Sequence, residues 1–292
     1  MPATMKPNVR YRMPTVFGPA PGPRQKADGT PWKVEETGTM NCTWFAVTYR
    51  AERTALEALL PPGFALRGEA EMSVSFSQFE NLYWLAGRGY GVVIVDIPAI
   101  YTGNTERIEG NFCPVMWEGR PDAILTGREE LGFPKLFADI SPIGFSPQAD
   151  TARGSASWFD HKFLDIEVHD LSPVEGDKSL PGSGGPAIFH KYFPRTSIGG
   201  SEAGTACVTS SYPPRGSGAD ASPIKLDNFA FKKWRGTGSV KWHRASFEQL
   251  PTTFHIVNAL ADLNSGAVVR AEMVKFSGPG IGVSANTIRT VD

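Results

Sequence analysis

The sequence has little of what several functional classes require. Among its 292 residues are only three cysteines, Cys42, Cys113 and Cys207, an odd number set far apart. This spacing fits neither a disulfide framework nor a zinc pattern, so we expect reduced, buried thiols. The five histidines lie in separate segments without HxH or HExxH spacing, which argues against a metal site.

Charge of one sign is also not in excess. The chain carries 29 basic and 30 acidic side chains, which leaves no basic face for a nucleic acid or an anionic membrane. No run of about 18 apolar residues occurs, and the first residues lack the apolar core of a signal peptide. We therefore expect a cytoplasmic protein with a small-molecule partner. No nucleophile elbow and no phosphate-binding loop are present.

Glycine and proline, in contrast, are abundant, with 31 and 24 residues. Residues 1–39 are rich in both and show no periodicity, which predicts an extended arm lying on its own domain or on a neighbouring subunit. Residues 40–292 are expected to form one β-rich catalytic domain. The arm also favours a homo-oligomer.

From Met40 onward, alternating or continuous apolar runs predict strands. Two segments have helical spacing, Ala51 to Leu60 and the stretch after Pro251, whereas GDKSLPGSGGP (residues 176–186) reads as a loop. The fold class is therefore α+β, mainly antiparallel, with no βαβ rhythm. The predicted strands lie near residues 42–50, 72–77, 91–101, 111–117, 163–168 and 267–276.

The stretch GREELGFPKLF (residues 127–137) places one lysine, Lys135, between apolar residues. Phe133, Pro134, Leu136 and Phe137 are candidates for a desolvated environment, which disfavours the charged ammonium. A neutral amine attacks a ketone and loses water to give an imine, an electron sink that needs no metal and no organic cofactor. From local sequence alone, a surface lysine is the commoner outcome for such a residue.

GREELGFPK resembles the signature of the acetoacetate decarboxylase superfamily, in which the lysine after (Phe/Tyr)-Pro forms the Schiff base. Similarity extends over most of residues 40–276, including WFAVTYRAERTALEALLPPGF and the segment from Leu250 onward. The resemblance implies a cone-like arrangement of antiparallel strands, with Lys135 as the nucleophile.

The departures from the decarboxylase pattern are specific. Decarboxylases of the superfamily carry a second lysine after the first, where this chain has Leu136. Their arginine at the start of the first strand aligns with Cys42, and two of their glutamates align with Ser77 and Val92. The resemblance therefore implies that the imine-forming lysine is kept and that the decarboxylation groups are altered.

A second branch of the superfamily shares the Met-Pro-x-x-Phe-Gly-Pro arm (residues 13–19) and resembles this chain in PVMWEG. That branch uses the lysine for aldol addition and dehydration on pyruvate-type oxo acids. The resemblance thus favours a cofactor-independent carbon–carbon lyase acting on a small oxo acid. An acetoacetate decarboxylase with different supporting groups is the second interpretation, and a non-catalytic β shell that binds a small molecule is the third.

Several further residues are candidates for the site. Arg128 is expected to bind a substrate carboxylate, or to pair with Glu129 in a turn. Glu118 follows an apolar run, where a carboxyl with a raised pKa acts as a general acid or base. The predicted catalytic residues are Lys135, Glu118, Tyr101 and Glu272, and the predicted substrate-binding residues are Arg128, Glu129 and Tyr90.

Overall fold

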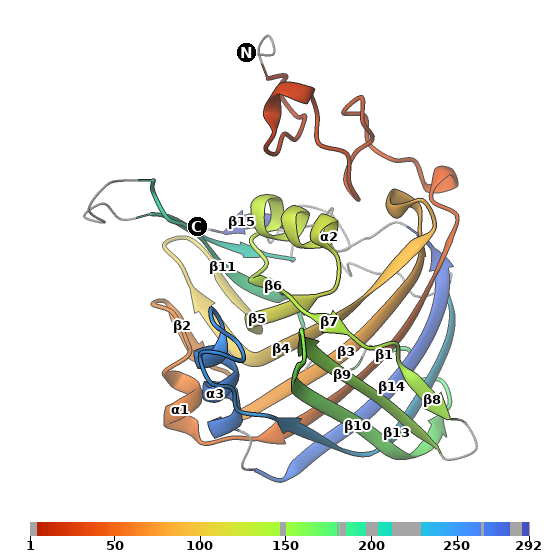
Figure 1. Cartoon of the computed structure of the whole chain (residues 1–292), viewed down its shortest axis with the longest axis vertical. Coiled ribbons are helices and arrows are strands. Elements are labelled where there is room, and N and C mark those ends of the chain that lie inside the picture. The colour runs from red at the N-terminus through yellow and green to blue at the C-terminus, as the bar shows by residue number, and fades with distance from the viewer. Residues whose placement is uncertain are drawn as a thin grey trace.

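The computed structural model describes residues 5–146, 150–179, 181, 185–196, 204–211, 229–263, 266–280 and 288–291. Its dominant feature is one mixed sheet of fifteen strands, strongly curled and, in this part of the chain, not closed (Figure 1). The main path through the sheet is β15 (Arg289–Val291), β12 (Thr205–Ser210), β11 (Ala187–Phe193), β5 (Arg107–Glu118), β4 (Arg88–Thr102), β3 (Glu71–Leu82), β1 (Thr39–Arg50), β14 (Val268–Pro279), β13 (Ala230–Trp242), β10 (His161–Val174), β9 (Thr151–Trp158) and β7 (Asp139–Ile140).

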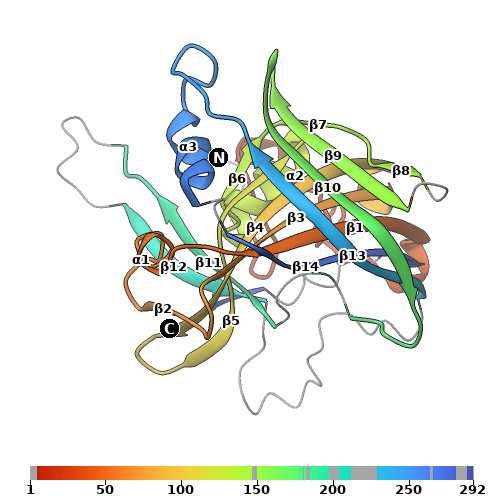
Figure 2. The ribbon, with the colours of Figure 1, turned by 90° about the horizontal axis from the view of Figure 1, so that it is seen from below.

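Three short strands join this path at its margins: β2 (Phe64–Leu66) beside β4, β6 (Lys135–Phe137) beside β5, and β8 (Gly144–Ser146) beside β9. Most neighbours are antiparallel, but β6 and β11 both pair in parallel with β5. The predicted α+β, mainly antiparallel fold class is therefore confirmed. Figure 2 shows β11 and β12 on one side of the molecule and β9, β10 and β13 on the other.

The two faces of the central strands bury different clusters. Along β4, Val93 and Val95 join the main core, whereas Val92 belongs to a second core on the opposite face. This is the alternation expected of a strand whose successive side chains point to opposite faces. The run from Gly91 to Tyr101 read as nearly continuous because both faces of β4 are covered.

Two helices pack against the main core. Helix α1 (Arg53–Glu57) is shorter than the predicted segment, and Glu52 caps it by accepting hydrogen bonds from the Thr54 and Ala55 backbone N–H groups at 3.0 and 2.7 Å. Helix α3 (Phe254–Leu263) buries Val257, Leu260 and Leu263 at helical spacing. No helix in the described residues is long and apolar enough to cross a membrane.

The other face of the sheet is covered by α2 (Pro121–Leu125) and the helical turn η4 (Thr126–Leu131), which follow β5 directly (Figure 1). The N-terminal arm, with its short turns η1 (Thr15–Phe17) and η2 (Val34–Glu36), contacts this region and η3 (Tyr83–Leu85). Arg12 donates to Thr126 Oγ1 at 2.7 Å, and the Tyr83 hydroxyl donates to the Pro23 carbonyl at 2.6 Å. The arm thus lies against its own chain here. Residues 1–4 and part of the predicted loop (180 and 182–184) lie outside the described residues.

Candidate active site

The motif around Lys135 is a helix-to-strand connection. Helix α2 continues as a π-helical turn through Arg128 and ends at Gly132, whose φ of 86° is the left-handed conformation that glycine adopts without strain. The chain then returns as β6, with Lys135 opposite Met116 of β5. Gly127 lies directly against the lysine: a Cβ built there would be 2.4 Å from Lys135 Cε and 2.6 Å from Nζ. The glycines of GREELGFPK therefore make room for the lysine and terminate the helical turn.

Lys135 is buried, with 6% of its side chain exposed. Its Nζ lies 2.7 Å from Glu118 Oε1 and donates to the Ala123 carbonyl at 3.1 Å. Nζ also lies 4.9 Å from the centre of the Phe133 ring. A cation and a carboxylate thus share one enclosed space, where their interaction is much stronger than in water.

Only part of the predicted apolar environment comes from neighbours in sequence. Phe133 contacts the lysine, but Leu136 packs against the main core on the opposite face of the sheet, and Phe137 is 44% exposed. The prediction was wrong for both residues. Leu136 points away from Lys135 because successive strand residues alternate in direction, whereas Phe137 stands at the exposed end of β6. The apolar walls come from distant segments instead.

A cavity of about 130 Å³ opens beside Lys135 Nζ, between η4, the sheet and the arm. Its walls are mainly apolar and aromatic, with Thr126 as a polar exception and Pro23 contributed by the arm. The lining residues are Pro23, Met40, Phe79, Leu82, Trp84, Tyr90, Ala123, Thr126, Gly127, Leu131, Phe133, Lys135 and Gly280.

Two acidic groups near the lysine have perturbed pKa values. Burial raises the pKa of the Glu118 carboxyl above its ordinary value, although the adjacent Lys135 ammonium acts in the opposite direction. Within the described residues, no donor reaches the buried Glu118 Oε2. Burial, and next the Glu118 carboxylate, raises the pKa of the Tyr90 phenol well above its usual range. Tyr90 therefore remains a protonated phenol, and burial also favours the neutral form of the nearby Glu118 carboxyl.

The predicted site residues separate into two groups. Lys135 of β6 and Tyr90 of β4 line the cavity, and Glu118 of β5 joins them through its contact with Lys135 Nζ. Arg128 does not enter it, because its Nη1 donates to the Lys135 backbone carbonyl at 2.8 Å and so fixes the connection into β6. Among the described residues, Arg128 and Glu129 do not form the predicted ion pair. The Glu129 backbone carbonyl accepts a separate hydrogen bond from Lys191 Nζ at 2.6 Å.

The two other predicted catalytic residues lie elsewhere. The Tyr101 ring packs 4.9 Å from Phe64, in an apolar cluster around Ile108 and Ile188. Glu272 accepts from Lys233 and Arg235, with the closest atoms 3.2 and 3.1 Å apart. Neither residue lines the cavity at Lys135, so the structure does not bring them together with the lysine. Nothing in the sequence around Tyr101 or Glu272 indicated these distant partners.

Two of the positions that depart from the decarboxylase pattern, Ser77 and Val92, lie side by side in the sheet. Ser77 pairs with Val92, and Val92 pairs with Glu118, so the three form one row across β3, β4 and β5. Where the resemblance places glutamates, this chain has Ser77 and Val92, and a carboxylate lies in the same row on the next strand. Cys42 is buried in the core shared with Phe79 and Tyr90, and burial raises the pKa of its thiol well above the usual range.

Sequence reasoning missed two contributors to the cavity. Thr126 lines it, and Arg12 holds the Thr126 hydroxyl from a position 114 residues earlier in the chain. The Met-Pro-x-x-Phe-Gly-Pro segment marked the arm in the sequence, but no local pattern pointed from it to the η4 turn.

Solved structures share this architecture. An acetoacetate decarboxylase from Legionella pneumophila has a TM-score of 0.62 at 18% identity, covering 88% of each chain. The enduracididine biosynthesis enzyme MppR, complexed with the condensation product of pyruvate and imidazole 4-carboxaldehyde, has a TM-score of 0.61 at 14% identity, covering 86% of this chain and 88% of that one. An acetoacetate decarboxylase-like enzyme from Sphingomonas wittichii RW1 has a TM-score of 0.58 at 14% identity, covering 82% and 88%. These likenesses define an acetoacetate decarboxylase-type fold.

The sequence itself then identifies the family. Residues 18–275 match acetoacetate decarboxylase (ADC), so the chain belongs to that family. No match is found among curated protein sequences.

Proposed function

We propose that the protein is a carbon–carbon lyase that forms an imine between Lys135 and a small 2-oxo acid, in the manner of an aldolase-dehydratase. The observation that carries this proposal is the buried 2.7 Å pair of Lys135 Nζ and Glu118 Oε1 at an otherwise mainly apolar cavity. Family membership supports an enzyme of this general kind, and the pyruvate condensation product in the MppR structure supports the substrate class.

Glu118 generates the nucleophile in this mechanism. The raised pKa of its carboxyl makes the carboxylate a stronger base, so it accepts a proton from the Lys135 ammonium. The neutral amine attacks the substrate carbonyl carbon, and the resulting carbinolamine loses water when Glu118 returns its proton to the departing hydroxyl. The protonated imine then withdraws electrons as an adjacent bond to carbon or hydrogen breaks.

Tyr90 and Thr126 supply the polar contacts for the rest of the substrate. Tyr90 remains protonated, so its hydroxyl donates a proton or a hydrogen bond to an oxygen leaving the enamine. The Thr126 hydroxyl accepts from Arg12, which leaves its own hydrogen to donate to the substrate carboxylate. We assign the carboxylate to the Thr126 hydroxyl, which Arg12 orients, in place of Arg128, whose guanidinium is bound to the main chain.

The residues at three positions favour aldol and dehydration chemistry over decarboxylation. The positions that the family resemblance links to the decarboxylase arginine and glutamates hold Cys42, Ser77 and Val92. The first is a buried thiol, and the buried Ser77 hydroxyl has no hydrogen-bond partner among the described residues. None of the three residues supplies the charge that the decarboxylase arginine and glutamates carry.

Borohydride trapping tests the proposal. The protein is incubated separately with pyruvate and acetoacetate, reduced, and examined by intact and peptide mass spectrometry, with carbon dioxide release measured in parallel. We expect a pyruvate-sized adduct on the peptide containing Lys135, absent in Lys135→Met of unchanged circular dichroism. An acetoacetate adduct with carbon dioxide release indicates the decarboxylase. No adduct from either acid contradicts the proposal and favours a binding shell.

A further inference from the structure

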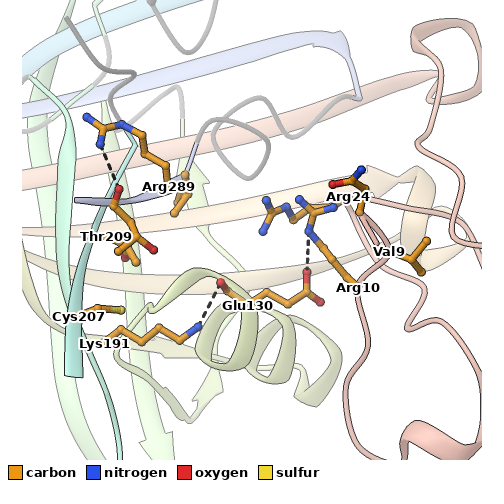
Figure 3. Close-up of a pocket in the computed structure, with 11 residues that line it drawn as sticks. Val9, Arg10, Arg24, Glu130, Lys191, Cys207, Thr209 and Arg289 are labelled. Atoms are coloured by element: carbon orange, nitrogen blue, oxygen red, sulfur yellow. Dashed lines mark hydrogen bonds and ion pairs between the residues drawn. The ribbon is translucent and has the colours of Figure 1, made fainter. Parts of the chain in front are cut away.

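A second cavity, of about 530 Å³, lies on the far side of the η4 turn from Lys135. Arg10 and Arg24 approach it from the arm, while Lys191, Thr209 and Arg289 face them from β11, β12 and β15 (Figure 3). None of these residues lines the cavity at Lys135. The second cavity is therefore a separate site with its own chemistry.

This pocket has more positive than negative charge. Its lining includes four cationic side chains but a single carboxylate, that of Glu130. Arg289 is matched by Glu106, at 2.8 Å. Arg10, Arg24 and Lys191 then leave three positive charges against one negative charge, an excess of two.

Glu130 cannot neutralise this group alone. Arg12 contacts it at 3.1 Å and Arg10 at 3.8 Å, so the single carboxylate is already shared between two guanidinium groups of the arm. Burial raises the pKa of the Glu130 carboxyl, which shows that its charged form is itself poorly solvated there. The cations facing the pocket therefore lack a full set of counter-charges.

Arg24 shows the imbalance most clearly. Among the described residues, none accepts a hydrogen bond from its buried Nε. Burial, followed by repulsion from Arg10, lowers the pKa of the Arg24 guanidinium to about 10. A guanidinium in a cavity, short of both acceptors and negative charge, is a site for an oxyanion.

We propose that this pocket binds a small organic dianion, a phosphate monoester or a dicarboxylate, between the guanidinium groups of Arg10 and Arg24 and the side chains of Lys191 and Thr209. Both kinds of ligand present paired oxygens that a guanidinium binds in a bidentate manner. Two negative charges match the excess of two among the lining residues, which Arg12 beside Glu130 can only increase. The proposal does not depend on imine chemistry at Lys135, so either can fail without the other.

Isothermal titration calorimetry tests it with inorganic phosphate and malonate as probes, in a series of titrations at different ionic strengths, each set with sodium chloride. We expect saturable binding of at least one probe, weakening as salt rises. Binding of phosphate alone identifies the phosphate-ester class, and binding of malonate alone identifies the dicarboxylate class. No heat from either probe beyond that of acetate overturns the proposal.

Variants locate the binding. Arg24→Met should weaken the affinity by about tenfold or more, because it removes one bidentate contact. Arg24→Lys keeps the charge and should retain part of the affinity, which separates loss of charge from loss of fold. Arg153→Met removes an exposed arginine on β9 that pairs with Glu167 at 3.1 Å, and it should bind as the parent does. Equal affinity in Arg24→Met and the parent contradicts the proposal.

Discussion

Lys135 Nζ and Glu118 Oε1 lie 2.7 Å apart, with only 6% and 3% of their side chains exposed. Removal of one partner leaves an uncompensated charge in a mainly apolar space, whereas removal of both does not. A change of charge at either residue should therefore alter both the stability of this region and imine formation at Lys135.

Glu118→Gln should slow imine formation roughly a hundredfold at pH 7, because the amide cannot take the proton from the Lys135 ammonium. Raising the pH should restore part of the rate, since hydroxide then deprotonates the amine directly. The measurement is the initial rate of borohydride trapping from pH 6 to 10. Glu109→Gln, an exposed carboxylate on the same strand β5 that pairs with Arg107, is the matched control and should trap at the parent rate. A Glu118→Gln rate that matches the parent at pH 7 would exclude Glu118 as the base.

Gly127→Ala should displace the lysine from its partner. The added Cβ would be 2.4 Å from Lys135 Cε and 2.6 Å from Nζ, closer than real atoms approach, so the ammonium must move away. We expect trapping to fall by about tenfold or more, and the free energy of unfolding by about 1 to 3 kcal/mol. Gly144→Ala, where no atom lies within 4 Å of the added Cβ, is the control. Parent-like trapping in Gly127→Ala would show that close packing here is not required.

Asp96 makes stability depend on pH. Burial raises the pKa of this half-buried β4 carboxyl from 3.8 to about 7. Because the folded state holds the proton more tightly, its stability falls as pH rises from about 4 to about 7 and is constant above that range. The shift corresponds to at most about 4 kcal/mol, and partial exposure reduces the expected change to about 1 to 3 kcal/mol.

Urea unfolding at pH 5 and pH 8 measures this dependence. Asp96→Asn should remove much of the difference between the two pH values and should be more stable than the parent at pH 8. The exposed Asp122→Asn should keep the parent's difference. If Asp96→Asn also keeps it, the carboxyl of Asp96 titrates in its ordinary range.

The parts of the fold that depend on local periodicity were predictable from the sequence. The alternation from Met72 to Ser77 predicted β3, and the β-branched run from Gly91 to Tyr101 predicted β4, because burial of each face repeats every second residue. The motif indicated Lys135 and the preceding apolar run indicated Glu118, and the structure places these two side chains 2.7 Å apart.

Side-chain contacts that depend on the tertiary fold were not predictable, whether the partners are near or far in sequence. Arg128 looked free to bind a substrate, but it donates to the carbonyl of Lys135, the residue at which the chain re-enters the sheet. Similarly, Arg12 reaches Thr126 across 114 residues. Charge and spacing in the sequence give the chemistry of a side chain, whereas its partner depends on how remote strands and the arm pack together.

Glu272→Gln tests whether the ion cluster on β13 and β14 is structural. Glu272 is 5% exposed and lies 3.2 Å from the nearly inaccessible ammonium of Lys233, which Asp177 also contacts at 3.0 Å. Loss of the carboxylate should lower the free energy of unfolding by about 3 kcal/mol, because Asp177 compensates the buried cation only in part. Trapping at Lys135 should stay within about twofold of the parent at a temperature where both are folded, since Glu272 does not line that cavity. Trapping that collapses while the thermal midpoint is unchanged would return Glu272 to the catalytic residues. Stability lost with chemistry retained assigns it to holding β13 against β14.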